Sequence, residues 1–309
     1  MADYGQTILL TGATGQVGGV ALRALAGRPV RVLARAPDAL VATGPVAESR
    51  HAQVSDPTRQ AEVVVGSFDD ADSLRRAFDG VDVMFLTGRD NPDQVAQHLR
   101  VLEVAAAAGV SHVVKLSAIG ARPDSPVALM RWHAAIESAL RGSGLAWTFV
   151  RPHLYMQNLL RFAGDVASAG RLAAPMGAAA FPLVDTRDVG AAVAAVLRSP
   201  AAHVGATYAL TGPSAATYAS VAAALAELVG APVHYEPLAP AAFHASLLDA
   251  GIPAWRADDL AAIASAYTAA DNTPTGDLER LLGRPATPLS QFLADHGETY
   301  RAGASRSHL

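Results

Sequence analysis

The chain has 309 residues, of which 51% are hydrophobic and 17% are charged, and its formal net charge is −4 at pH 7. This composition excludes an intrinsically disordered chain, and the small negative charge argues against nucleic acid or an anionic membrane as a partner. The chain contains no cysteine, which excludes disulfides, thiolate catalysis and cysteine-bound zinc.

No targeting or membrane segment is evident in the sequence. The opening residues, MADYGQTILL, have neither a basic flank nor the apolar run of a signal peptide, and no apolar stretch approaches the ~20 residues of a membrane span. The ten histidines are scattered without an H-x-x-x-H pair, so no metal site is expected. We therefore expect a cytoplasmic protein.

The first half of the chain alternates short apolar runs with longer helical patterns. The predicted strands are 7–11, 30–34, 62–65, 81–86, 112–117 and 146–150, and the predicted helices include 16–26, 92–108 and 126–142. Strands that are apolar throughout are buried on both faces, and their alternation with helices gives βαβ units. The pattern predicts an α/β fold with a doubly wound parallel sheet of the Rossmann type, whose ligand crevice lies at the carboxyl ends of the strands.

After Arg151 the rhythm changes. Loop and helix are predicted for 153–181, returning strands for 181–186 and 206–212 with a helix over 187–198 between them, and mostly helix for 213–309 with a short strand at 233–236. We expect residues 1–152 plus 182–212 to form the Rossmann domain, and residues 153–181 plus 213–309 to form a smaller, discontinuous, mostly helical substrate lobe. Residues 36–60 are expected to be an extended loop, and the final residues to be frayed.

The motif TGATGQVGG follows the first predicted strand and opens the first helix. Its glycines, Gly12, Gly15 and Gly18, suit a tight turn, a close approach of backbone to a pyrophosphate, and close packing of helix on strand. Amides at the helix start and the helix dipole stabilise phosphates. The motif predicts a dinucleotide site, to which Thr14, Gln16 and Val17 of the same turn also belong.

The end of the second strand indicates which nicotinamide dinucleotide binds. An NAD site usually has Asp or Glu there, whereas this strand ends in Ala34 and Arg35. The guanidinium of Arg35 can pair with a ribose 2′-phosphate, with Arg31 as a weaker candidate. We expect NADP(H) in preference to NAD(H), the alternative being that Arg35 is a solvated surface residue.

Further residues at the strand ends are expected to line this cofactor. Phe68 and Asp69 would flank the adenine, although Asp69 or Asp70 could equally cap the helix that follows. The other expected cofactor contacts are Leu86, Thr87 and Gly88 after the fourth strand, and Pro152 and Leu154 after the sixth.

The chain resembles the NmrA-like atypical short-chain dehydrogenases. The resemblance rests on TGATGQVG, Arg35, GSFDD at 66–70, RPHLYMQN at 151–158, FPLVDTRDVGAAVAAVL at 181–197, YALTGP at 208–213 and LLGRPATPLSQFL at 281–293. That group includes NAD(P)H-dependent quinone reductases, azoreductase-like proteins, tailoring enzymes of natural-product biosynthesis and a dinucleotide-sensing transcriptional co-regulator. The resemblance implies a Rossmann domain with a small C-terminal substrate lobe, and it leaves the substrate open.

The resemblance also indicates an active site and one departure from it. Ser117 matches the serine of ordinary short-chain dehydrogenases and could orient a substrate carbonyl or bond backbone, but their Tyr-x-x-x-Lys pair is missing. His133 stands near the lysine position and Leu129 near the tyrosine position. We expect His133 to contact the nicotinamide ribose or to act as a general acid, the alternative being a structural histidine.

Two charged residues near this site are ambiguous. Glu137 lies one helical turn after His133 and could hold its second ring nitrogen, but a surface carboxylate is the favoured interpretation. Lys115, the one lysine of the chain, lies one strand step from Ser117 on the same face. An unpaired buried amine would be costly, so we expect Lys115 to reach solvent or a carboxylate.

The turn after the sixth strand is expected to lie beside the nicotinamide. Tyr155 or His153 would point into the substrate space, with Tyr155 the third candidate catalytic residue beside His133 and Ser117. Gln157 and Asn158 could cap a helix or contact the ligand. The helically spaced apolar residues Met156, Leu159, Leu160 and Phe162 are expected in the core or pocket wall, and Phe243, Leu247, Trp255 and Tyr267 are candidates for the pocket.

Three functions remain open at this point. We favour an NADPH-dependent oxidoreductase that transfers a hydride to a quinone or related aromatic carbonyl compound, possibly in secondary metabolism, because such an acceptor needs little acid chemistry in a dry, apolar cleft. The alternatives are a non-catalytic NADP(H)-sensing regulatory protein, and a non-redox isomerase, cyclase or epimerase on the same fold. A monomer or a homodimer is expected.

Overall fold

The computed structural model describes residues 5–36 and 61–301. The loop expected over 36–60 and the frayed end therefore lie almost wholly outside the described residues. Within the described part of the chain, no helix is both long enough and apolar enough to cross a membrane.

Seven parallel strands form the central sheet, in the order β3-β2-β1-β4-β5-β6-β9. The strands are β1 (Ile8–Thr11), β2 (Val30–Ala34), β3 (Glu62–Val65), β4 (Val83–Leu86), β5 (His112–Leu116), β6 (Ala146–Pro152) and β9 (Ala206–Leu210). The order reverses beside β1, which is the point at which doubly wound sheets bind ligands. The predicted parallel Rossmann-type sheet is confirmed.

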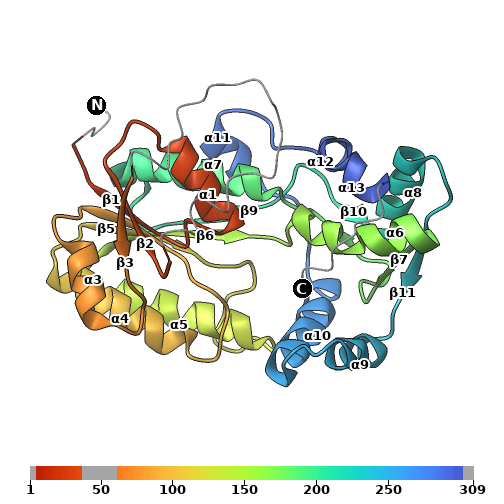
Figure 1. Ribbon diagram of the computed structural model, residues 1–309, viewed down its shortest axis with the longest axis horizontal. Coiled ribbons are helices and arrows are strands. Elements are labelled where there is room, and N and C mark those ends of the chain that lie inside the picture. Colours follow the sequence, from red (N-terminus) through yellow and green to blue (C-terminus); the bar gives the residue numbers. More distant parts are fainter. Residues whose placement is uncertain (1–4, 37–60, 302–309) are drawn as a thin grey trace.

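Helices cover both faces of this sheet (Figure 1). On one face lie α1 (Gln16–Ala24), α7 (Thr186–Arg198) and α11 (Asp277–Leu282), and on the other lie α3 (Ala71–Phe78), α4 (Gln94–Ala107) and α5 (Ala128–Gly142). A short 3-10 helix, Pro200–His203, leads into β9. Because both faces are covered, the central strands β1 and β4 are buried at every residue.

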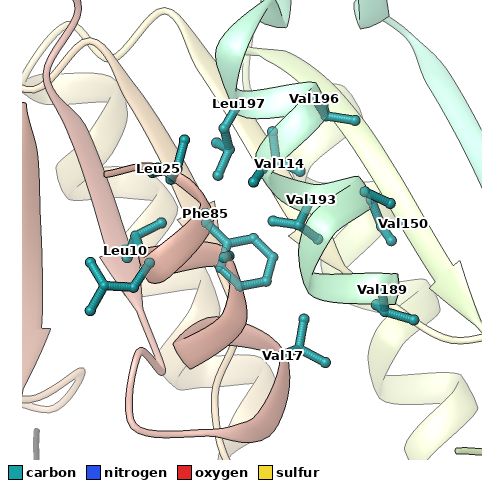
Figure 2. Packing of buried hydrophobic residues seen from close by; sticks show 14 of the residues in the cluster. Leu10, Val17, Leu25, Phe85, Val114, Val150, Val189, Val193, Val196 and Leu197 are labelled. Atoms are coloured by element: carbon teal, nitrogen blue, oxygen red, sulfur yellow. The ribbon is translucent and has the colours of Figure 1, made fainter. Parts of the chain in front are cut away.

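The buried residues of the core between the sheet, α1 and α7 are aliphatic apart from one large ring. Figure 2 shows Phe85 of β4 between the two helices, with Leu10, Val17 and Val193 around it. The two helices approach closely at Gly190, where a Cβ atom would lie 2.5 Å from Cβ of Val20. The α1–α7 pair thus fixes where α1 begins relative to the sheet.

The C-terminal region is mostly helical, as predicted, and packs around its own cluster of buried residues. It contains η2 (Met156–Phe162), α6 (Ala163–Ala169), β7 (Arg171–Ala174), β8 (Ala180–Phe181), β10 (Ala216–Thr217), α8 (Tyr218–Val229), β11 (His234–Pro237), α9 (Pro240–Asp249), α10 (Ala254–Thr268), α12 (Leu289–Asp295) and α13 (Gly297–Arg301). The strands pair as β10–β8 and β11–β7. The cluster also includes Val127, Leu129 and Met130 at the start of α5, so the two regions share a packed boundary.

One predicted strand is wrong. Residues 181–186 do not form a returning strand, because β8 ends at Phe181 and only an isolated bridge joins Val184 to Tyr155. Pro182 has no amide hydrogen to donate, which interrupts the ladder. Asp185 then caps α7 by accepting a hydrogen bond from the Arg187 amide.

Candidate active site

The turn between β1 and α1 needs glycine at defined positions. Gly12 has φ +62°, a conformation that side chains rarely adopt, and the Gly15 amide donates to its carbonyl oxygen at 2.9 Å. A Cβ atom on Gly18 would lie 2.2 Å from the Gly12 carbonyl oxygen. These contacts close the turn tightly against the first turn of α1.

The start of α1 is open to a ligand. Gly15 is the N-cap residue and supplies no side-chain cap, so the first-turn amides have no side-chain acceptor. Thr14, Gly15 and Gln16 are exposed, whereas Val17 and Gly18 are buried beneath them. Free amides at the positive end of a helix dipole fit the diphosphate of a dinucleotide.

The end of β2 separates the two arginines that were candidates for a 2′-phosphate. Arg35 is exposed and makes no ion pair within the part of the chain that the structure describes. Arg31 is engaged elsewhere, because its Nε donates to Glu62 at 2.8 Å and its Nη1 donates to the Ala77 carbonyl at 3.0 Å. These partners make Arg31 the less suitable of the two arginines, whereas Arg35 has no anionic partner among the described residues.

The segment after β3 is held by α3 and α4. Asp70, not Asp69, caps α3 by accepting from the amides of Asp72 and Ser73. The Asp69 carboxylate accepts from the Gln97 side-chain amide at 3.1 Å and lies 3.4 Å from an Arg100 nitrogen. Its expected contact with adenine would have to be made alongside these partners.

The end of β4 is fixed against the glycine turn and α4. Thr11 donates to the Thr87 carbonyl at 2.8 Å and accepts from its amide at 2.9 Å. A Cβ atom on Gly88 would lie 3.0 Å from the His98 ring and 3.2 Å from Phe68. Burial lowers the pKa of His98 to about 3, so that ring is neutral. Backbone at Thr87 is therefore held beside the glycine turn, and the cofactor contacts expected of Thr87 and Gly88 stay a prediction.

Lys115 and His133 form a buried pair, which corrects the expectation for the lysine. The lysine side chain is 1% exposed, and its Nζ lies 3.2 Å from Nδ1 of His133. Leu86 and Phe149 flank it on the neighbouring strands, so it faces α5 rather than solvent. Burial lowers the pKa of Lys115 to about 7.

Glu137 is neither a partner of His133 nor a surface residue. It is 1% exposed, and its Oε1 accepts from Ser117 Oγ at 2.6 Å and from Arg151 Nε at 2.8 Å. Arg141 reaches its other oxygen at 3.2 Å. Both interpretations of Glu137 from the sequence are wrong. The Ser117 hydroxyl hydrogen points at this carboxylate, which disfavours its expected use as a donor to substrate.

The turn after β6 joins the sheet to the C-terminal region. His153 is buried, and its Nε2 lies 3.1 Å from Asn272 Oδ1 while its ring packs edge-on against Tyr267. The Tyr155 hydroxyl makes no hydrogen bond with the described residues, and burial raises its pKa above the ordinary value. Gln157 does not face a ligand, since its side chain bonds Asp185 and the Thr186 amide at the start of α7.

The candidate pocket residues of the helical region have different surroundings. Tyr267 is buried and its hydroxyl donates to the Ile119 carbonyl at 3.2 Å. Trp255 of α10 packs against Trp132 of α5 with ring centroids 6.0 Å apart. Phe243 and Leu247 are half-buried on α9. Met156 and Leu159 are core residues, with Leu160 and Phe162 packed against that core.

Sequence reasoning missed two residues that organise this site, Asp259 and Asn272, and it missed the partner of a third, Lys115. Asp259 of α10 accepts from the Leu129 amide at 3.1 Å and so caps α5 from another element. Asn272 orients His153, and Lys115 contacts His133. The position of a lone lysine inside an apolar strand was the signal for Lys115, whereas the other two pairings join residues more than 100 positions apart and left no local signal.

Known proteins resemble the chain over nearly its whole length. The model of the NmrA-like family matches residues 5–294. A (4-alkanoyl-5-oxo-2,5-dihydrofuran-3-yl)methyl phosphate reductase of Streptomyces griseus is 38% identical, with 95% of this chain and 99% of the relative covered. An NAD(P)H azoreductase of Xenophilus azovorans is 33% identical, with 96% and 99% covered. The structure of an Escherichia coli NADPH-dependent quinone oxidoreductase in complex with NADPH superposes with a TM-score of 0.80 at 29% identity, covering 93% and 99%.

Proposed function

Since the chain belongs to the NmrA-like family, we propose that it is an NADPH-dependent reductase that transfers a hydride to a quinone or a related aromatic carbonyl compound. The observation that carries the proposal is the glycine turn, whose Gly12–Gly18 contact leaves no room for a side chain and at which the first-turn amides of α1 make no hydrogen bond with the described residues. The relatives named as reductases of furanone, azo and quinone compounds support the reaction class.

The residues around the glycine turn and at the neighbouring strand ends would bind each part of the cofactor. Amides at the start of α1, from Gln16 onward, would bind the diphosphate together with the exposed Thr14, while Gly15 keeps the turn closed through its bond to the Gly12 carbonyl. Arg35 would pair with the 2′-phosphate. Backbone around Thr87 and the turn at Pro152 would line the ribose and nicotinamide, with the other expected contacts at Val17, Phe68, Leu86, Gly88 and Leu154. Bound NADPH supplies the hydride, and the chain supplies position and a dry cleft.

Two side chains are proposed to meet the acceptor. His133 keeps 8% of its surface exposed, and its Nε2 makes no hydrogen bond with the described residues. The Tyr155 hydroxyl is likewise free of partners there. Both are N–H or O–H donors suited to an oxygen that gains negative charge. Ser117 is proposed to act indirectly, by anchoring Glu137.

The test is NADPH and NADH oxidation against a panel of quinones, azo dyes and aromatic ketones. We expect faster turnover with NADPH, and a loss of about a hundredfold in kcat for His133→Ala. His112→Asn removes a buried histidine at the opposite end of the β5–β6 pair and serves as its matched control. Tyr155→Phe is matched by Tyr235→Phe, whose hydroxyl bonds the Ala174 carbonyl at 3.0 Å.

Each result has a consequence. Wild-type turnover by both His133→Ala and Tyr155→Phe would contradict the site assignment. NADPH uptake without oxidation by any acceptor would contradict the reductase, and it would favour a sensing protein. Conversion of a substrate without net consumption of cofactor would favour an isomerase or epimerase.

A further inference from the structure

The buried amine of Lys115 has few partners for a charged group. Its Nζ donates to the adjacent Leu116 carbonyl and lies 3.2 Å from His133 Nδ1. Among the described residues no carboxylate oxygen lies within ion-pair distance of it. A fully buried ammonium with no ion pair is costly, so this amine is poised to release its proton.

The titratable and charged groups that surround the pair come from several elements. They are Glu137 on α5, Asp90 in the loop after β4, His98 on α4 and Arg151 on β6. Glu137 and Asp90 raise the pKa of Lys115, but burial outweighs them and leaves it at about 7. Burial, reinforced by the positive charge of Lys115, lowers the pKa of His133 well below its ordinary value, so the ring is neutral.

The contact determines which nitrogen of His133 carries hydrogen. An ammonium has three donors and no acceptor, so Nδ1 must be the acceptor in the Lys115–His133 bond. A neutral imidazole carries one hydrogen, which therefore lies on Nε2. The Nε2–H group is the one that remains without a partner among described residues.

We propose that Lys115 is a positioning residue that holds His133 as its Nε2–H tautomer and replaces, through the ring, the proton that His133 gives to the reduced substrate. The inference rests on the proposed function. The helix lacks the Tyr-x-x-x-Lys pair of ordinary short-chain dehydrogenases, and here an amine reaches the site from strand β5 instead.

The proton movement balances. As the acceptor is reduced, its carbonyl oxygen gains negative charge and takes the proton from His133 Nε2. The bond between Nζ and one of its hydrogens breaks, and that proton passes to Nδ1. The ring stays neutral as the opposite tautomer, and Lys115 becomes a neutral amine that accepts a hydrogen bond from Nδ1–H. Return of one proton from solvent restores the starting state.

The tautomer can be measured without cofactor or turnover. Long-range ¹H–¹⁵N NMR of the full chain at pH 6, assigned with His133→Asn, should show Nδ1 as the unprotonated nitrogen and Nε2 as the protonated one. Lys115→Met should relax this preference to a mixture of tautomers. A protonated Nδ1 in the wild-type ring would overturn the inference while leaving the reductase proposal intact. Because this spectrum is recorded on the wild-type chain, the result holds even where Lys115→Met does not fold.

The pH profile tests proton supply. With a quinone acceptor, wild-type kcat should fall as the pH rises above about 7, the pKa of Lys115. In Lys115→Met, kcat should no longer fall along this alkaline limb above about pH 7, and at pH 7 it should be about a hundredfold lower than in the wild type, with a smaller change in KM. Thr148→Val, which removes a buried hydroxyl on β6 beside His112, should keep both the limb and kcat. An alkaline limb unchanged in Lys115→Met would contradict the relay.

Discussion

Ser117 at the end of β5 donates a hydrogen bond of 2.6 Å to Glu137 on α5, inside the protein. The same carboxylate binds Arg151 of β6, so three elements meet at one buried charge. A hydrogen bond to a buried charged group contributes more to stability than one between neutral groups. Ser117 therefore belongs to the scaffold of the site.

This bond predicts a stability effect for Ser117→Ala. Removing the hydroxyl leaves a buried carboxylate oxygen with one donor fewer, and should lower the free energy of unfolding by about 1–3 kcal/mol. Ser143→Ala, which removes a half-buried hydroxyl bonded to the Leu140 carbonyl, should cost less. Urea unfolding of both variants gives the comparison. Unchanged stability with a collapse of kcat would instead make Ser117 a donor to substrate.

The glycine turn predicts a sharp difference between two Gly→Ala substitutions. At Gly18 the new methyl would overlap the Gly12 carbonyl, whereas at Gly164 in α6 nothing lies within 4 Å. Gly18→Ala should destabilise the fold by roughly 1–3 kcal/mol through overpacking and abolish dinucleotide uptake. Gly164→Ala should be neutral or stabilise by about 0.5–1 kcal/mol. Thermal unfolding with and without NADPH measures both effects, and equal behaviour of the two variants would contradict the close contact.

The lowered pKa of Lys115 should make the free energy of unfolding rise with pH. Its pKa is about 7 in the folded state against 10.5 for an ordinary lysine, so between these values the unfolded chain binds more protons. The free energy of unfolding should therefore rise with pH by about 1.4 kcal/mol per unit from this group, over a window from about pH 7 to 10. Lys115→Met should remove this contribution. Urea titrations at several pH values test it, and parallel curves for the two proteins would refute a buried amine.

A second pH effect of known sign comes from His112, far from the cofactor turn. Burial lowers its pKa to about 4, so below pH 6.5 the unfolded state takes up a proton that the folded state refuses. Stability from this group is present at neutral pH and is lost on acidification from pH 6.5 to 4, by up to about 1.4 kcal/mol per unit. His112→Asn should unfold with a shallower acid dependence than wild type. An unchanged slope would show that burial does not lower the pKa of His112.

The side chain of Arg35 is expected to determine the preference for NADPH over NADH. An exposed guanidinium without an ion pair among the described residues can take a 2′-phosphate bidentately. Arg35→Ala should weaken NADPH binding by about 1.5–3 kcal/mol, roughly tenfold to a hundredfold, and leave NADH binding nearly unchanged. Arg75→Ala on α3, an exposed arginine paired with Asp72, is the control. An equal loss for both dinucleotides would remove the 2′-phosphate contact.

The sheet could be predicted from the sequence because its strands are apolar on both faces. The runs at 30–34 and 62–65 are strands with those bounds, and 112–117 is one residue too long. The predicted strand at 181–186 is wrong for a reason that the sequence itself shows. Pro182 has no amide hydrogen to donate to a neighbouring strand, and β8 ends at Phe181. A run that is apolar but contains proline is therefore not a strand here.

The side chains of the site were less predictable, because their partners lie far apart in the sequence. Glu137 falls on the buried face of α5 in line with His133, and the charged partner that makes this possible, Arg151, is brought to it only by the return of β6. The strand position of Lys115 predicts an amine that reaches solvent or a carboxylate, but Leu86 and Phe149 flank it, α5 covers it and its partner is His133. Spacing along one helix or strand defines a face, whereas the groups that meet on that face come from elsewhere.

Titration calorimetry of the purified chain with NADPH tests the central claim most directly, namely that the glycine turn binds a dinucleotide diphosphate. Within the described part of the chain the amides at the start of α1 and the Arg35 side chain have no acceptor, which predicts saturable binding at one site per chain. Binding should be tighter for NADPH than for NADH and lost in Gly18→Ala. Absence of binding by NADPH, NADP⁺, NADH and NAD⁺ alike to the folded protein would contradict the account.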